Sequence, residues 1–159
     1  MSPREFLRKL RGYPVSEWRW MVEAGLSLAW ARFLIRFVPF PRWRGRMGPI
    51  GEGAPMPPLA GAQRATAYMV RRWVQRVAAN ASFTANCLPQ AMAARWMLAR
   101  RGIATELHIG ARPGTRGDRP IDLHAWLLCG DLCLTGERER HAFEAFQASS
   151  RRAPPGLNA

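Results

Sequence analysis

The sequence predicts an α+β fold in which helices come first and a small antiparallel sheet follows. In the first part of the chain apolar side chains recur at the spacing of a helix face, and after Gly102 they alternate as in strands. The chain has 159 residues, 48% of them hydrophobic, which is enough to bury one core. We therefore expect the last helix to pack against the sheet, with the other helices preceding it.

Four helices are expected, each bounded by residues that start or stop helices. Their ranges are 2–11, 16–38, 63–79 and 86–102. Residues 45–61 are rich in Gly and Pro and are expected to form a loop. In the fourth helix Asn86 suits the N-cap, Pro89 is tolerated in the first turn, and Gly102 ends the helix. Its apolar residues are expected to form one buried stripe, made of Leu88, Met92, Trp96 and Ala99.

Strands are expected after the last helix, and the turn between two of them sets a register. Their ranges are 104–112, 121–129 and 132–137. If Gly130 and Asp131 form a two-residue turn, His124 lies opposite Glu137 on the same face of the sheet. A three-residue turn would place Gly136 there instead. The polar tail from residue 149 is expected to be disordered.

The charge balance favours acidic partners. Lys and Arg number 24 against 11 acidic residues, a formal net charge of +13 that is concentrated in the first half of the chain. No nucleic-acid-binding motif is present in the sequence, so nucleic acid is not an expected partner. The aromatic segment FVPFPRW, at residues 37–43, favours docking to a protein or to lipid headgroups, which gives an expectation of peripheral membrane contact.

The cysteines and the apolar segments indicate where in the cell the protein is expected to be. Three cysteines match neither a zinc-ligand spacing nor a disulfide framework, so reduced thiols in the cytoplasm are expected, with no metal and no cofactor. The most apolar span, residues 20–40, is interrupted by Glu23, Arg32 and Arg36 and is not expected to cross a membrane. The first residues lack the features of a secretory signal.

Cys87 is the candidate nucleophile. It stands at the start of a predicted helix, where the partial positive charge favours a thiolate and free amides can hold an oxyanion. Cys129 and Cys133 are expected to be packing residues of the strands. Gln90, one helical turn from Cys87, and Trp126 are expected to line the substrate cleft.

A nucleophilic thiol also needs a base and a group that orients the base. His124 is the candidate base, because it lies in an apolar strand with Trp126 on the same side. Glu137 is the candidate acid from the pairing argument, and Asp122 and Asp131 are the alternatives.

Three segments carry a family resemblance: NCLPQAMAARWMLARRGIATELHIGAR, LHAWLLCGDLCLTG and LAWARFLIRFVPFPRWRGRMG. Together they resemble the leader peptidases of lasso-peptide biosynthesis, which are transglutaminase-like cysteine proteases. The resemblance implies a transglutaminase-like or papain-like core with Cys87 as nucleophile and His124 as general base. The acid of that family is usually an aspartate on the next strand, where this chain has Thr135, Gly136 and Glu137.

The resemblance implies an organisation and an activity. Residues 1–62 would be a helical region with its loop, 63–148 the peptidase core and 149–159 the tail. The enzyme would remove the leader from a lasso-peptide precursor and leave the core peptide for macrolactam formation. Implied partners are the precursor, a separate winged-helix protein that binds the leader, and an ATP-dependent lasso cyclase. Two alternatives stay open: a thiol acyltransferase of the transglutaminase type, and a non-enzymatic basic module that binds membranes or partners.

Overall fold

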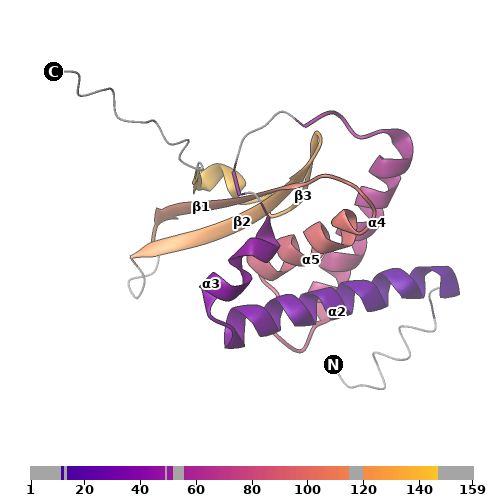
Figure 1. The fold of residues 1–159 in the computed structure, drawn as a ribbon, viewed down its shortest axis with the longest axis horizontal. Helices are drawn as coiled ribbons and strands as arrows, with labels where there is room; N and C mark the ends of the chain where they lie inside the picture. Colours follow the sequence, from indigo (N-terminus) through magenta and orange to yellow (C-terminus); the bar gives the residue numbers. More distant parts are fainter. Residues whose placement is uncertain (1–11, 13, 49, 52–55, 115–119, 147–159) are drawn as a thin grey trace.

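The computed structural model of the protein describes residues 12, 14–48, 50–51, 56–114 and 120–146 (Figure 1). The helices are α2 (Val15–Phe37), α3 (Phe40–Trp43), α4 (Gly61–Asn80) and α5 (Cys87–Ala99), and single 3₁₀ turns are η1 (Arg44–Met47) and η2 (Arg140–Ala142). The strands are β1 (Glu106–Pro113), β2 (Ile121–Cys129), β3 (Leu132–Thr135) and β4 (Glu144–Ala145). The α+β class is thus confirmed. The helix expected over residues 2–11 lies outside the described residues.

Helix α5 forms the middle layer of the molecule. It contacts α2 and α4 as well as strands β1, β2 and β3, and Figure 1 shows it between the sheet and α2. The expectation of a single buried stripe was therefore wrong: of its members only Met92 is buried, while Leu88 and Trp96 are half-buried and Ala99 is exposed. Because neighbours surround the helix, residues on several of its sides are buried, namely Pro89, Ala91, Met92, Ala93, Ala94, Met97 and Leu98.

The sheet is antiparallel and has the strand order β3-β2-β1-β4. Successive side chains of a strand point to opposite faces. In β2, Ala125 and Leu127 join the hydrophobic core, which also contains residues of all three long helices. His124 and Trp126 are buried as well but point to the other face. After β3 the chain crosses that second face through η2 and reaches β4 at the opposite edge, beside β1.

The hairpin of β2 and β3 begins as expected and then changes register. Cys129 pairs with Leu132 across a two-residue turn. A β-bulge between Leu127 and Leu128 then shifts the pairing by one residue, so that Leu127 lies opposite Thr135. The strand ends there. The expected pairing of His124 with Glu137 is therefore wrong. The turn residues predict the pairing next to the turn, but they do not predict a bulge, which adds one residue to the strand and shifts the later pairs.

Three short elements were missed by the sequence analysis. Residues 40–47, for which no helix was expected and of which 45–47 were assigned to a loop, instead form α3 and η1. Trp43 and Met47 are buried there, and the Trp43 indole donates a hydrogen bond to the Val38 carbonyl at 3.0 Å. Strand β4 pairs with Ala111 and Gly110 of β1. Elements this short have too few residues to show a periodicity. Within the described segments, none of the helices combines the length and apolar character that a membrane-spanning segment needs.

Candidate active site

Cys87 is the first residue of α5, and no side chain caps the helix there. Asn86 occupies the N-cap position with an extended backbone, but its side chain makes no capping hydrogen bond. The Gln90 amide donates instead to the Ala85 carbonyl at 2.7 Å. Pro89 has no N–H, so the amides of Cys87 and Leu88 are the ones left without an intrahelical acceptor. Two N–H groups at the positive end of a helix can stabilise a thiolate or a developing oxyanion.

Exposure separates Cys87 from the other two cysteines. Its side chain is half-buried, whereas Cys129 and Cys133 are buried. Burial raises the pKa of the Cys129 thiol to about 11, with a smaller contribution from the negative charge of Asp131. Burial also raises the pKa of Cys133. These two thiols stay neutral and serve packing, since only a thiolate is an effective nucleophile.

The imidazole of His124 is held by a backbone carbonyl. The side chain is buried, and its Nε2 lies 2.8 Å from the oxygen of Gly136. A carbonyl oxygen can only accept, so Nε2 must carry the proton of this hydrogen bond. In the neutral ring Nδ1 is then the nitrogen with a free lone pair. The structure therefore identifies Nδ1 as the atom of His124 that can act as a base.

Only glycine fits at position 136. Gly136 has a φ of +76°, a conformation that other residues adopt rarely. A Cβ at this position would lie 2.5 Å from the Ala125 carbonyl oxygen, 2.8 Å from Cβ of Trp126 and 2.9 Å from Nε2 of His124. The absence of a side chain lets the carbonyl approach the imidazole. In this part of the chain the family resemblance implies an aspartate, and here the Gly136 carbonyl contacts the imidazole instead.

Two aromatic rings pack against His124. Its ring centroid is 5.0 Å from that of Phe143 and 6.0 Å from that of Trp126. Trp126 in turn stacks on His108 at 5.6 Å, with an interplanar angle of 5°. The guanidinium of Arg112 lies 4.5 Å from the Phe143 ring centroid. The structure therefore places Trp126 beside His124, the expected base. The segment between β3 and β4, which carries Phe143, covers the His124 ring.

The acids proposed from the sequence bind arginines instead of His124. The carboxylate of Glu137 is 3.0 Å from Arg71 on α4. Asp131 is paired with an arginine of α4 at 2.8 Å, and Asp122 with an arginine of β1 at 3.4 Å.

Glu139, which the sequence analysis did not consider, is a carboxylate that approaches His124. Its Oε2 lies 3.9 Å from Nδ1 of His124, and 66% of its side chain is exposed. This distance is too long for a hydrogen bond but allows an ion pair once the imidazole is protonated. No signal in the sequence could have selected it, because the bulge and the turn after β3 decide where it lies.

Cys87 and His124 are not joined by a hydrogen bond among the described residues. Their pairing stays a prediction from the sequence. Gln90 is half-buried, and its amide folds back toward the start of α5. Among all residues that the structure describes, no group of three His, Cys, Asp or Glu side chains is arranged to hold a metal ion.

A comparison with protein-family models finds a match over most of the chain. The model described as the transglutaminase-like superfamily matches residues 31–148, which is most of the chain. The chain belongs to the transglutaminase-like superfamily. No curated protein and no solved structure matches it.

Membership indicates activity of the cysteine protease or acyltransferase type. Both reactions use a thiol nucleophile and a basic nitrogen. Cys87 at the start of the central helix and His124 on the adjoining sheet are the residues expected from the sequence to supply those two groups. The match begins at residue 31, within α2, so residues 15–30, about two thirds of that helix, lie outside it.

Proposed function

We propose that this protein is a cysteine protease that removes the leader peptide from a ribosomally made lasso-peptide precursor. One observation carries the proposal: a half-buried thiol, Cys87, begins an uncapped helix within a transglutaminase-like domain whose sheet holds a histidine of defined tautomer. The choice of a leader peptide as substrate rests on the family resemblance of the sequence.

The proposed reaction starts with proton transfer. Nδ1 of His124 takes the proton of the Cys87 thiol, and the sulfur attacks the carbonyl carbon at the leader–core junction. This step requires the sulfur at the start of α5 to come within hydrogen-bond distance of Nδ1, which lies on the face of β2 that points away from the core, when substrate binds. The amides of Cys87 and Leu88 stabilise the negative oxygen of the tetrahedral intermediate.

The intermediate then collapses. The C–N bond breaks, the imidazolium gives its proton to the leaving amine of the core peptide, and the leader remains on Cys87 as a thioester. Water, deprotonated by His124, attacks the thioester and releases the leader with a free carboxylate and a regenerated thiol. Throughout, the Gly136 carbonyl holds the ring through Nε2, the task that an aspartate performs in other triads. Glu139 stabilises the imidazolium.

The same proposal includes partners and a place of action. The precursor would be presented by a separate winged-helix protein that binds the leader, and an ATP-dependent lasso cyclase would receive the free core amine. The reaction would take place in the cytoplasm. Transfer of the acyl group from Cys87 to an amine instead of water is the second candidate, because the superfamily contains both kinds of enzyme.

The test is mass spectrometry of a lasso precursor peptide incubated with the protein and a leader-binding partner. The wild type should release a leader fragment and a core fragment. Cys87→Ala and His124→Ala should release neither, whereas His141→Ala, an exposed histidine of η2, should cleave normally. Circular dichroism checks that each variant is folded.

Two outcomes would contradict the protease proposal. If the precursor stays whole but hydroxylamine traps an acyl group that depends on Cys87, the protein is an acyltransferase. If the wild type neither cleaves nor forms a thioester, or if Cys87→Ala cleaves as well as the wild type, the assignment of Cys87 is wrong.

A further inference from the structure

Helix α2 has an apolar face on each side. One side is buried against α4 and α5 and carries Met21, Ala24, Ser27, Leu28, Ala31 and Leu34. The opposite side would normally be polar in a surface helix. Here it carries large apolar residues that are between 39% and 81% exposed: Val15, Trp18, Val22, Leu26, Trp30, Phe33, Phe37 and, at the start of α3, Phe40. We call these eight residues the outer stripe.

The outer stripe is continuous. Its members on α2 follow one another mostly at intervals of three or four residues, so they lie in one row along the helix. At a rise of 1.5 Å per residue, the 23 residues of α2 make this row about 34 Å long. Trp30 stacks on Phe33 with centroids 5.4 Å apart, and Phe33 contacts Phe37 at 5.4 Å. Figure 1 shows α2 as the layer farthest from the sheet, so the stripe faces away from His124.

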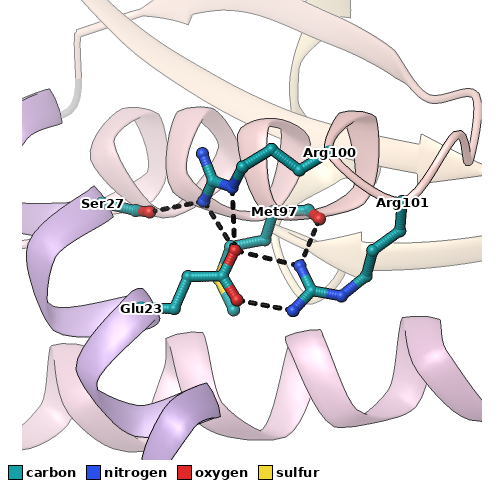
Figure 2. Close-up of polar contacts among 5 residues, drawn as sticks. All are labelled: Glu23, Ser27, Met97, Arg100 and Arg101. Atoms are coloured by element: carbon teal, nitrogen blue, oxygen red, sulfur yellow. Dashed lines mark hydrogen bonds and ion pairs between the residues drawn. The ribbon is translucent and has the colours of Figure 1, made fainter.

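The acidic residues of this region are turned toward the protein. Residues 15–47 contain two of them, Glu17 and Glu23. Glu17 lies 3.5 Å from Arg72 of α4. Figure 2 shows Glu23 pointing from α2 to Arg100 and Arg101 at the end of α5, at 2.8 and 2.6 Å.

Arginines border the stripe on the solvent side. The exposed ones are Arg19, Arg36, Arg42, Arg44 and Arg46. The guanidinium of Arg36 lies 5.5 Å from the Phe37 ring centroid, and that of Arg46 lies 5.9 Å from Trp30. The outer face therefore combines an aromatic row with positive charge.

We propose that the outer stripe docks on an anionic lipid membrane, with the aromatic rings at the boundary of headgroups and acyl chains and the arginines on lipid phosphates. Helices that lie in this interface combine Trp, Phe and Leu on one side with flanking cations. A straight row of about 34 Å fits a flat surface and needs no groove in the partner. A second copy of the chain fits poorly, since a symmetric contact through this face would bring two sets of arginines together. This inference is independent of the proposed protease activity.

Vesicle flotation tests the proposal with the full chain. The wild type should float with vesicles of equal parts phosphatidylcholine and phosphatidylglycerol, and the bound fraction should fall with pure phosphatidylcholine or at high salt. Phe33→Gln with Phe37→Gln should lower the partition coefficient about tenfold or more. Tyr68→Gln on α4, an equally exposed aromatic residue outside the stripe, is the matched control and should bind like the wild type.

The charge is tested in the same assay. Arg36→Gln with Arg46→Gln should weaken binding to anionic vesicles and reduce its salt dependence, while Arg138→Gln, exposed after β3, should not. All substituted side chains are exposed, so loss of binding is not loss of the fold, and circular dichroism verifies this.

Three results would overturn the proposal. The first is no flotation of the wild type, or flotation that the stripe variants leave unchanged. The second is a concentration-dependent dimer, seen by analytical ultracentrifugation without vesicles, that Phe33→Gln with Phe37→Gln abolishes; the stripe then binds a second copy. The third is that Phe33→Gln with Phe37→Gln floats like the wild type but no longer binds the purified leader-binding protein or cyclase. The stripe then binds a protein and not a membrane.

Discussion

Nε2 of His124 lies 2.8 Å from the carbonyl oxygen of Gly136, and this contact fixes the tautomer of the buried imidazole. A backbone group thereby does what an acidic side chain would do, which is to hold the ring so that Nδ1 is free to accept a proton. The contact depends on the left-handed backbone of Gly136 and on the lack of a Cβ.

Gly136→Ala is expected to impair both activity and stability. The new Cβ would meet backbone and side-chain atoms at 2.5 to 2.9 Å, and the positive φ adds strain of about 1–3 kcal/mol. We expect the free energy of unfolding, measured in urea, to fall by at least that amount and the rate of precursor cleavage to fall about tenfold or more. Gly45→Ala is the control, because nothing lies within 4 Å of a Cβ there. Equal effects at both positions would refute the role of the Gly136 contact.

Glu139→Gln should slow cleavage, and Glu137→Gln should not. Glu139 approaches Nδ1 of His124 and favours the imidazolium, but its exposure limits the effect to about threefold. Glu137 is bound to Arg71, away from the ring. The kcat of the two variants on one precursor decides between them. A larger loss with Glu137→Gln would restore the acid expected from the sequence.

Alkylation should distinguish the three thiols. Iodoacetamide at pH 8 is expected to modify Cys87 in the folded protein and to spare Cys129, because burial holds the pKa of that thiol at about 11. Cys133, also buried, should be spared too. Peptide mapping after a time course gives the three rates, and urea-unfolded protein provides the reference. Modification of the three thiols at similar rates in the folded state would contradict the burial described.

Glu23→Gln should reduce stability at neutral pH. The carboxylate accepts hydrogen bonds from Arg101 at 2.6 and 3.0 Å and from Arg100 at 2.9 Å, and its side chain is 23% exposed. Loss of this charged network between α2 and α5 is expected to cost about 2 kcal/mol at pH 7. Asp131→Asn removes a more exposed ion pair and should change stability less. Urea unfolding of the three proteins is the measurement.

The loss caused by Glu23→Gln should depend on pH. The hydrogen bond from Arg101 is the main cause that holds the pKa of Glu23 below its ordinary value of 4.5, against the opposing effect of burial. A carboxyl with a lowered folded pKa contributes its full stability above the unfolded value and loses it as pH falls through the folded value. The stability difference between wild type and variant should therefore be constant from pH 7 to 5 and shrink below about 4.5. A difference that grows on acidification would show the sign to be wrong.

Local sequence determined the long helices and strands of this protein and the place of Cys87, the proposed nucleophile, in the chain. Helix α5 begins at Cys87 and β2 covers residues 121–129, as expected, because apolar spacing and turn residues act over a few neighbours. The two-residue turn before Leu132 was also predictable, since Gly-Asp is a turn signal in itself.

Tertiary structure decided what surrounds His124. The bulge at Leu127 and Leu128 turned the expected Glu137 away, and the crossover to β4 brought Gly136 and Glu139 over the ring instead. These choices depend on residues packing across the whole sheet, and no short segment encodes them. The same holds for α2: its sequence shows apolar residues all round, and only the positions of α4 and α5 decide which of them are buried and which remain on the surface.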